Sequence, residues 1–179
     1  MKKYHCQEIT ENLLNKEIRL SGGVSKRRDH GGIIFVGWRD YTGIVQLVFN
    51  PEDKELFLKA ESIRSEFVIE VKGIVSDRLE GTINNDLITG KIEIIVSSLR
   101  ILKKSETPPL KINDDNVNED QRLQYRYLDM RSDKMQKTMR FRSKLIQVIR
   151  NFFYSKEFVD VETPILTKTT PEGARDYLV

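Results

Sequence analysis

The feature that most constrains the fold is the stretch at residues 33–49, IIFVGWRDYTGIVQLVF. Apolar and other residues alternate along 33–40 and again along 44–49, and only YTG separates the two runs. Side chains of a β-strand alternate between two faces, and a connection this short joins antiparallel neighbours. The stretch therefore predicts a β-hairpin.

Three further segments of the first hundred residues are also typical of strands: 17–24, 67–76 and 91–101. Between the third and fourth strands, Leu56, Ala60 and Ile63 fall at helical spacing behind Pro51. Five strands with one helix after the third is the element order of the OB-fold, a Greek-key barrel. Residues 1–103 are therefore predicted to form a mainly β domain, a five-stranded OB-fold barrel.

The character of the sequence changes after this domain. Residues 104–133 begin with a polar stretch that contains two consecutive prolines, which predicts a hinge. Within 134–179, apolar residues at three- and four-residue steps predict one long helix, and FVDVETPIL (158–166) predicts a short strand. One helix and one strand do not complete a sheet-based domain. We therefore expect 134–179 to be the truncated start of a larger domain.

Composition excludes several classes of protein. The net charge is only +3, which restricts any nucleic-acid surface to a local patch. No apolar run approaches the roughly 20 residues that a membrane span needs. Cys6 is the one cysteine, so no intrachain disulfide forms and a reducing, cytoplasmic location is expected. Cys6 adjoins His5, but no second ligand pair stands nearby, and we predict no metal site.

The alternation along the hairpin assigns side chains to faces. Ile34, Val36 and Trp38 share the more apolar face, which predicts that they enter the core. Phe35 then lies on the other face, toward solvent or a ligand. The alternative is that Phe35 closes the bottom of the barrel, since an isolated aromatic residue in a strand is usually a core residue.

Other polar residues are predicted to share the outer face with Phe35. They are Gln46 in the third strand, Glu93 in the fifth, and Arg27 and Arg28 in the run that precedes the hairpin. An aromatic ring in such a setting can stack on a base, the amide and the carboxylate can read base edges, and the arginines can hold phosphate. The alternative is an ordinary solvated loop with scattered surface residues.

Three segments together resemble bacterial-type aspartyl-tRNA synthetases: SKRRDHGGIIFVGWRDYTGIVQLVF (25–49), LQYRYLDMR (123–131) and FVDVETPILTKTTPEGARDYLV (158–179). The similarity runs over the whole chain. The barrel pattern is shared with lysyl- and asparaginyl-tRNA synthetases, whereas TKTTPEGARDYLV favours the aspartyl enzyme.

The resemblance implies a modular class II enzyme in which the barrel binds the anticodon loop of a tRNA. A hinge follows, and an α+β catalytic domain uses ATP and Mg²⁺ to activate aspartate and then transfers it to the tRNA. Phe35 is expected to stack on the central anticodon uridine. The other residues expected to contact the anticodon bases or backbone are Arg28, Gln46, Asn84 and Glu93.

The resemblance also assigns roles near the end of the chain. Residues 158–166, including Pro164, resemble the motif that builds the homodimer interface of class II enzymes. Glu172 is expected to meet the ammonium group of bound aspartate, with a loop-capping acid as the alternative. The two motifs that bind ATP are not in these 179 residues, so we expect no catalytic residue, no bound cofactor and no adenylate formation in this chain.

The chain departs from the family pattern at several positions. Glu157 replaces the usual glycine before Phe158, which predicts that the long helix lacks a left-handed C-terminal cap. Gly23 stands where tryptophan is common, and Trp38 is expected to fill that volume. Thr82 stands where asparagine is common.

His30 and Gly81 are the residues expected to set tRNA discrimination. In this family a histidine and a glycine at these places tend to accompany relaxed enzymes that charge both aspartate and asparagine tRNAs. A glycine carries no side chain that could reject a third anticodon base. The sequence therefore raises the hypothesis of relaxed specificity.

Two further alternatives remain open from the sequence. Residues 122–150 hold nine Lys or Arg against two Asp, which fits either a solvated helix face or a surface along the tRNA backbone. The barrel itself could be a free-standing single-strand-binding module, or part of a lysyl- or asparaginyl-tRNA synthetase.

Overall fold

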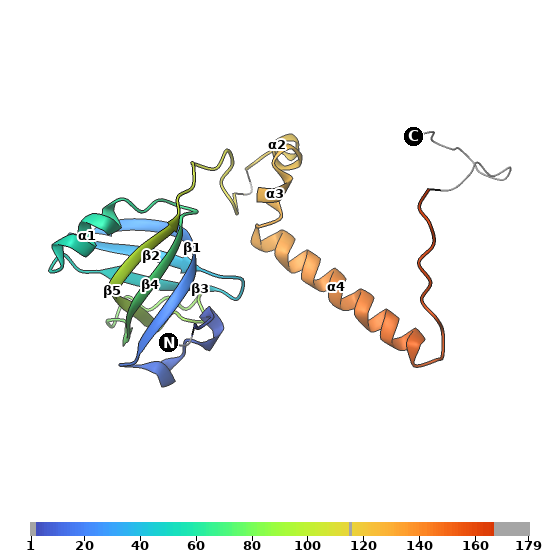
Figure 1. The fold of residues 1–179 in the computed structure, drawn as a ribbon, viewed down its shortest axis with the longest axis horizontal. Coiled ribbons are helices and arrows are strands. Elements are labelled where there is room, and N and C mark those ends of the chain that lie inside the picture. The colour runs from blue at the N-terminus through green and yellow to red at the C-terminus, as the bar shows by residue number, and fades with distance from the viewer. Residues whose placement is uncertain (1–2, 115, 167–179) are drawn as a thin grey trace. The chain divides into compact units, whose positions relative to one another are not determined.

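The structure is a computed structural model that describes residues 3–114 and 116–166. The chain divides into two compact units, residues 1–109 and 110–179 (Figure 1). The elements of the first unit are η1 (Cys6–Glu8), η2 (Glu11–Leu13), β1 (Glu17–His30), β2 (Ile33–Arg39), β3 (Ile44–Phe49), α1 (Lys54–Glu61), β4 (Val68–Asp77) and β5 (Ile92–Lys103).

The five strands close into a barrel in the order β1-β2-β3-β5-β4. Neighbouring strands are antiparallel except β3 and β5, which run parallel, and β1 closes the ring by pairing with both β2 and β4. The helix α1 lies between β3 and β4 along the chain. The predicted five-stranded barrel with one helix after the third strand is confirmed.

Strand β1 is six residues longer than the predicted 17–24, because the cationic run of Lys26, Arg27 and Arg28 and the two residues after it also pair with β2. Pairs from Lys26↔Gly37 to His30↔Ile33 extend the hairpin to its turn, where Gly31 and Gly32 take φ values of +62° and +77°. A run of charged residues carries no apolar alternation, so its strand character comes from the partner strand and not from its own composition.

A β-bulge at Ser25 interrupts β1, since the register with β2 shifts between Val24 and Lys26. The main chain beside the bulge is held by the loop before β4. The Val24 N–H donates to the Phe67 carbonyl over 2.8 Å, and the Glu66 N–H donates to the Val24 carbonyl over 2.8 Å. A bulge adds one residue to a strand and reverses the alternation of side chains beyond it.

The barrel interior is filled as the alternation predicts. Ile34, Val36 and Trp38 are fully buried, and Ile92, Ile94 and Val96 line the core from β5. The Trp38 ring lies directly over Gly22 on β1, where a methyl group would approach its Cζ2 to 2.7 Å. Gly22 is therefore required by the close approach of the indole ring.

Helix α1 begins at an N-cap, where Asp53 accepts a hydrogen bond from the Leu56 N–H over 3.0 Å. Leu56 and Ala60 face the core, as their helical spacing predicts, and Ile63 follows them into the same cluster. The helix is therefore held against the barrel by one apolar face.

The N-terminal segment is attached to the barrel by Asp40, in the turn between β2 and β3. Asp40 Oδ2 accepts from the Cys6 N–H over 2.9 Å and lies 3.3 Å from His5 Nδ1. Its Oδ1 accepts from the N–H and hydroxyl of Thr42, both over 2.7 Å, and from the Gly43 N–H.

Cys6 is buried, and its thiol is not part of a disulfide. The residues that the structure describes contain no group of three or more His, Cys, Asp or Glu arranged to hold a metal ion.

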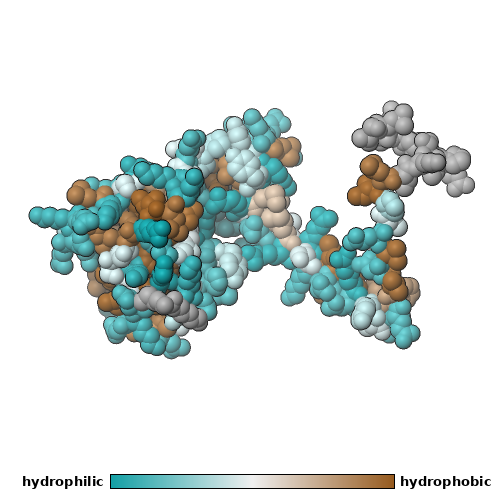
Figure 2. Space-filling view, in the orientation of Figure 1, coloured by the Kyte–Doolittle hydropathy of each residue, from teal (hydrophilic) through white to brown (hydrophobic). Residues whose placement is uncertain are grey.

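The second unit is helical. It contains α2 (Glu119–Gln124), α3 (Arg126–Asp129) and α4 (Asp133–Tyr154). Asn118 and Ser132 cap the N-termini of α2 and α4. The apolar stripe predicted on the long helix is present but largely exposed, and Figure 2 shows hydrophobic surface gathered toward the end of α4 and in the chain after it.

Helix α4 ends in a Schellman motif that contains Glu157 in place of glycine. The Phe158 N–H donates to the Phe153 carbonyl over 3.2 Å, and the Glu157 N–H donates to the Tyr154 carbonyl over 3.0 Å. Glu157 takes a left-handed φ of +65°, and the rings of Phe153 and Phe158 pack edge to face at 5.4 Å. The prediction that this helix lacks a left-handed cap is wrong. The motif forms because its two hydrogen bonds and ring contact offset the strain at Glu157.

Residues 158–166 form irregular chain, and the strand predicted there is not formed in the described structure (Figure 1). A strand needs a hydrogen-bonded neighbour, and no described segment pairs with this one. Within the described ranges, no helix is both long and apolar enough to cross a bilayer.

Candidate nucleic-acid interface

Phe35 lies on the outer face of the barrel. Its neighbours Ile34 and Val36 are fully buried, whereas Phe35 is half-buried and is not part of the core cluster. Its strand partners, Arg28 on β1 and Val48 on β3, share this face because directly paired residues project to the same side of a sheet. The predicted outward orientation is confirmed, and the alternative of a core phenylalanine is excluded.

A polar row crosses the same face next to the ring. Lys26 pairs with Gly37, Gly37 with Gln46, and Gln46 with Glu93. The Gln46 amide Nε2 donates to Glu93 Oε2 over 2.9 Å. Gly37 has no side chain, and a methyl group there would be in ordinary van der Waals contact with Ile44, 3.6 Å from its Cγ2. The face can accept a flat ring and present hydrogen-bonding groups to its edge.

The structure separates the two arginines that were predicted to hold phosphate together. Arg28 pairs with Phe35 and shares its face. Arg27 pairs with the buried Val36 and therefore projects to the opposite side. Its guanidinium Nη2 lies 3.5 Å from Asp29 Oδ2.

Arg78 is a residue of this region that the sequence did not single out. It is buried at the end of β4, where its Nε donates to the Ile92 carbonyl over 3.1 Å and its Nη1 to the Thr82 carbonyl over 3.4 Å. Burial lowers the pKa of Arg78, Glu93 opposes that shift, and Arg28 adds to it. A single arginine after a predicted strand has no periodicity, so no sequence signal distinguishes it from a solvated residue.

Asn84 lies in the connection between β4 and β5. Its Oδ1 accepts from the Asp86 N–H over 3.0 Å, and its own N–H donates to the Gly90 carbonyl over 3.1 Å. The loop lines a cavity of about 350 Å³ together with the N-terminal segment, to which it is joined by the Lys91–Glu11 ion pair at 3.1 Å. Asn84 therefore belongs to this loop and not to the strands that carry Phe35.

The two residues assigned to tRNA discrimination are both exposed, one at a strand end and one in a loop. His30 ends β1 opposite Ile33, and Gly81 takes a φ of +87° in the connection after β4. A methyl group at Gly81 would meet nothing within 4 Å. Neither residue joins the polar row of Gln46 and Glu93.

The residues assigned to the second unit are only partly described. Pro164 is exposed within the irregular chain after α4. Glu172, predicted to bind the substrate ammonium, lies outside the described residues.

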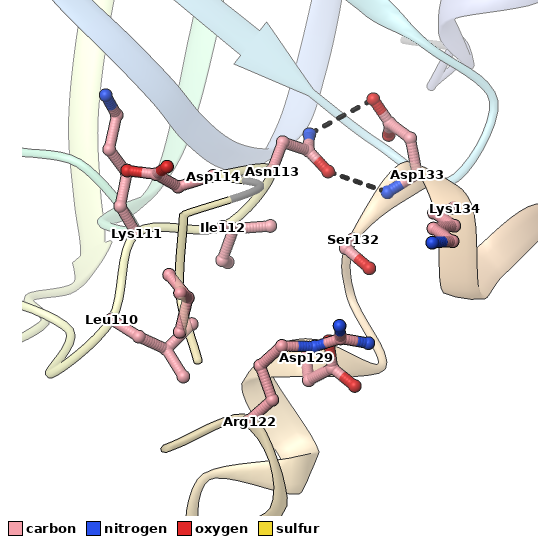
Figure 3. A pocket seen from close by; sticks show the side chains of 11 residues that line it. Leu110, Lys111, Ile112, Asn113, Asp114, Arg122, Asp129, Ser132, Asp133 and Lys134 are labelled. Carbon is pink, nitrogen blue, oxygen red and sulfur yellow. Dashed lines mark hydrogen bonds and ion pairs between the residues drawn. The ribbon is translucent and has the colours of Figure 1, made fainter. Parts of the chain in front are cut away.

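A separate cavity of about 440 Å³ lies in the second unit, between the start of α4 and the chain before α2 (Figure 3). Asn113 and Asp133 close one side: the Asn113 Nδ2 donates to Asp133 Oδ2 over 3.1 Å, and the Asp133 N–H donates back to Asn113 Oδ1 over 2.7 Å. On the other side, Arg122 and Arg126 both pair with the buried Asp129. Arg150 also pairs with Asp160 over 2.9 Å, so at least three of the nine basic residues counted in 122–150 are engaged within the unit.

Two protein families match the chain. The family described as OB-fold nucleic acid binding domain matches residues 18–102. The family described as tRNA synthetases class II (D, K and N) matches residues 118–179. The barrel and the segment from residue 118 onward therefore correspond to two recognised modules.

Relatives and solved structures agree with these matches. The chain is 50% identical to the aspartate–tRNA(Asp/Asn) ligase of Legionella pneumophila (strain Corby) over 180 aligned residues, all of this chain and 30% of the length of that relative. It is similar to asparaginyl-tRNA synthetase from Pyrococcus horikoshii complexed with asparaginyl-adenylate, at 30% identity and a TM-score of 0.83, over 97% of this chain and 39% of the other. Aspartyl-tRNA synthetase from Entamoeba histolytica, at 21% identity and a TM-score of 0.84, over 96% of this chain and 41% of the other, shares the fold.

Proposed function

We propose that the chain is part of a class II aspartyl-tRNA synthetase and that its barrel binds the anticodon loop of a tRNA; the 50% identity to the Legionella ligase and the two family matches support this. The aligned region makes up 30% of the length of the Legionella relative, which is a longer ligase. The proposed activity of the whole protein is the activation of aspartate with ATP and its transfer to tRNA(Asp).

One observation carries the proposal for the barrel: the outward ring of Phe35 shares a face with Arg28, Gln46 and Glu93. Stacking of a base on an aromatic ring contributes about 1–3 kcal/mol and is independent of base identity. The hydrogen-bonded pair of Gln46 and Glu93 supplies the groups that distinguish bases, and Arg28 supplies charge for the backbone. We assign Asn84, in the adjoining loop, to a neighbouring nucleotide.

The other functional assignments come from the family. ATP and Mg²⁺ serve the reaction of the whole protein, and the described residues of this chain offer no carboxylate or histidine cluster for a metal. We propose that the whole protein is a cytoplasmic homodimer, with the exposed apolar residues of 158–166 and Pro164 at the subunit contact, and that Glu172 binds aspartate.

Relaxed specificity is a second proposal, which is favoured by the Legionella relative because that protein is named as a ligase for both Asp and Asn tRNAs. His30 and Gly81 would permit it, since Gly81 presents no side chain to the third anticodon base. Charging of the two tRNAs by the full-length enzyme tests the proposal. Similar rates would support it, and a preference above roughly a hundredfold, close to 3 kcal/mol in transition-state terms, would contradict it.

Direct titration tests the proposed anticodon binding. An RNA stem-loop with GUC at the anticodon position is titrated against the chain, beside a stem-loop with the same stem and a scrambled loop. Tighter binding of the GUC loop supports an anticodon-binding domain. Equal affinities would favour a general single-strand binder, although the class II match over residues 118–179 argues against a free-standing module.

A further inference from the structure

The cationic run of β1 contributes to two different faces of the barrel, and the bulge at Ser25 determines which residue goes to which face. Ile18, Leu20 and Val24 face the core at even positions. Without an extra residue, Lys26 would continue that series inward and Arg27 would face outward. The bulge reverses the alternation, so Lys26 instead pairs with Gly37, between the inward-facing Val36 and Trp38.

We infer that Lys26, and not Arg27, joins Arg28 in binding phosphate on the outer barrel face that carries Phe35. Arg27 is instead a structural residue of the barrel. This inference rests on the proposed anticodon binding. It assigns the RNA backbone to the β1 edge of the face, along Lys26 and Arg28. The base would then lie on Phe35, toward Gln46.

The surroundings of Lys26 fit a contact with RNA backbone. Lys26 is exposed, and among the described residues it makes no ion pair with a carboxylate. Lys26 and Arg28 are two positions apart on one strand face, about 6.6 Å along the strand, so both charges can act on one stretch of backbone. Gly37, which pairs with both Lys26 and Gln46, adds no side chain of its own between them.

The surroundings of Arg27 fit a structural role. Its partner Val36 belongs to the core, and the side chain of Arg27 is only 24% exposed. Its Nε is buried without a hydrogen-bond partner in the described structure, and the outer guanidinium nitrogen lies near Asp29. The aliphatic stem of Arg27 thus covers apolar surface while its charge is balanced locally.

Matched substitutions test this division of roles. Lys26→Met and Arg27→Met each remove one charge and keep an unbranched apolar stem. Affinity for the GUC stem-loop is measured by fluorescence anisotropy over a series of salt concentrations, and thermal unfolding is followed for both variants.

Neutralising one phosphate of a single strand changes the slope of log K against log salt by about 0.7, which corresponds to about a fivefold change in affinity at 0.1 M salt. We expect Lys26→Met to lose about fivefold in affinity and about 0.7 of slope, with unchanged unfolding. We expect Arg27→Met to keep the wild-type slope and affinity, within twofold, and to lower the unfolding temperature.

The outcomes separate this inference from the proposed function. If the wild-type chain does not prefer the GUC loop, the proposed function fails and the inference fails with it. If the wild type binds as proposed but Arg27→Met loses the slope, or Lys26→Met leaves it unchanged, only the inference is overturned. Should Arg27→Met not fold, Lys26→Met decides alone, and Lys26→Arg must then restore the slope.

Discussion

The side chains of Gln46 and Glu93 meet across the parallel pair of β3 and β5, where the Gln46 Nε2 donates to Glu93 Oε2 over 2.9 Å. This bond fixes the orientation of both groups before any RNA arrives. It leaves the Gln46 carbonyl and the second Glu93 oxygen as acceptors for the edge of a base. The pair is therefore preorganised to accept hydrogen bonds from N–H donors, as the proposed recognition of a base edge requires.

Glu93→Gln should weaken discrimination between loops more than it weakens binding itself. The amide replaces one acceptor with a donor, so a base N–H that met the carboxylate would meet an N–H. A mismatched edge costs about 1–3 kcal/mol, and we expect the affinity ratio of GUC to scrambled loops to fall at least about fivefold. Parallel anisotropy titrations measure the ratio. Glu52→Gln, at an exposed site before α1, is the control and should leave the ratio unchanged.

Phe35→Ala should weaken binding of the GUC stem-loop by about 1–3 kcal/mol and leave the barrel folded, because the ring stacks outside the core. Phe49→Ala is the matched comparison, since that ring is fully buried. It should lower the free energy of unfolding by about 3–5 kcal/mol. Anisotropy titration and chemical unfolding are measured for both. Loss of folding in Phe35→Ala would contradict the assigned face.

The alternation of Ile34, Val36 and Trp38 was sufficient to predict the core side of β2 and the outward ring of Phe35, because a strand has one strict period. The faces of the cationic run could not be predicted in the same way. Its register depends on the bulge at Ser25, which is held by main-chain bonds from residues 66 and 67, about forty positions away. A sequence pattern does not contain that long-range contact.

Two other differences have similarly physical origins. The role of Arg78 could not be predicted from the sequence, because its hydrogen-bond partners are backbone carbonyls, which every residue supplies. The left-handed end of α4 does not follow from the preference of that conformation for glycine, because main-chain hydrogen bonds stabilise the non-glycine residue Glu157 there. Those bonds, together with the contact of Phe153 and Phe158, maintain the motif around Glu157.

Glu157→Gly should stabilise the end of α4. A non-glycine residue in the left-handed region costs roughly 1 kcal/mol relative to glycine, and the bonds of the motif remain available to the variant. Hydrogen exchange of the Phe158 amide should therefore slow about fivefold. Glu157→Ala retains a Cβ and should give no such gain. Equal exchange in the two variants would show that backbone strain at this position is not the relevant factor.

Asp40 should make the stability of the chain pH-dependent in acid. Burial would raise the pKa of Asp40, but hydrogen bonds from Thr42, Cys6 and Gly43 outweigh it and lower the pKa below 3.8. A depressed folded-state pKa gives stability that is present above the unfolded value and is lost as the pH falls through the folded value. Wild-type stability should therefore decline below about pH 4.

Asp40→Asn is the variant that isolates this effect. Near neutral pH it should cost about 1–3 kcal/mol, because its single amide oxygen cannot replace both carboxylate oxygens as acceptors for the Cys6, Thr42 and Gly43 donors. The gap between the variant and the wild type should narrow as the pH falls toward 2. Thermal unfolding over a pH series measures it. A gap that stays constant with pH would mean that the charge of Asp40 contributes nothing.

Cys6 should resist thiol reagents in the folded chain. Burial and the adjacent Asp40 carboxylate raise the pKa of the thiol to about 12. Only the thiolate reacts, so labelling by a disulfide reagent at pH 8 should be about a thousandfold slower than in denaturant. Absorbance of the released thiolate follows the reaction. Equal rates in the folded and unfolded chain would place Cys6 at the surface.

The ring closure of the barrel also has a consequence for synthesis on the ribosome. Glu93 reaches Gln46 only when β5 docks beside β3, and β1 remains half-paired until β4 has joined it. A nascent chain that has emerged only through Phe49 thus carries the outward ring of Phe35 but lacks Glu93, the partner of Gln46. The pair of Gln46 and Glu93, and with it the proposed selectivity for an anticodon loop, is therefore completed only after translation has passed residue 103.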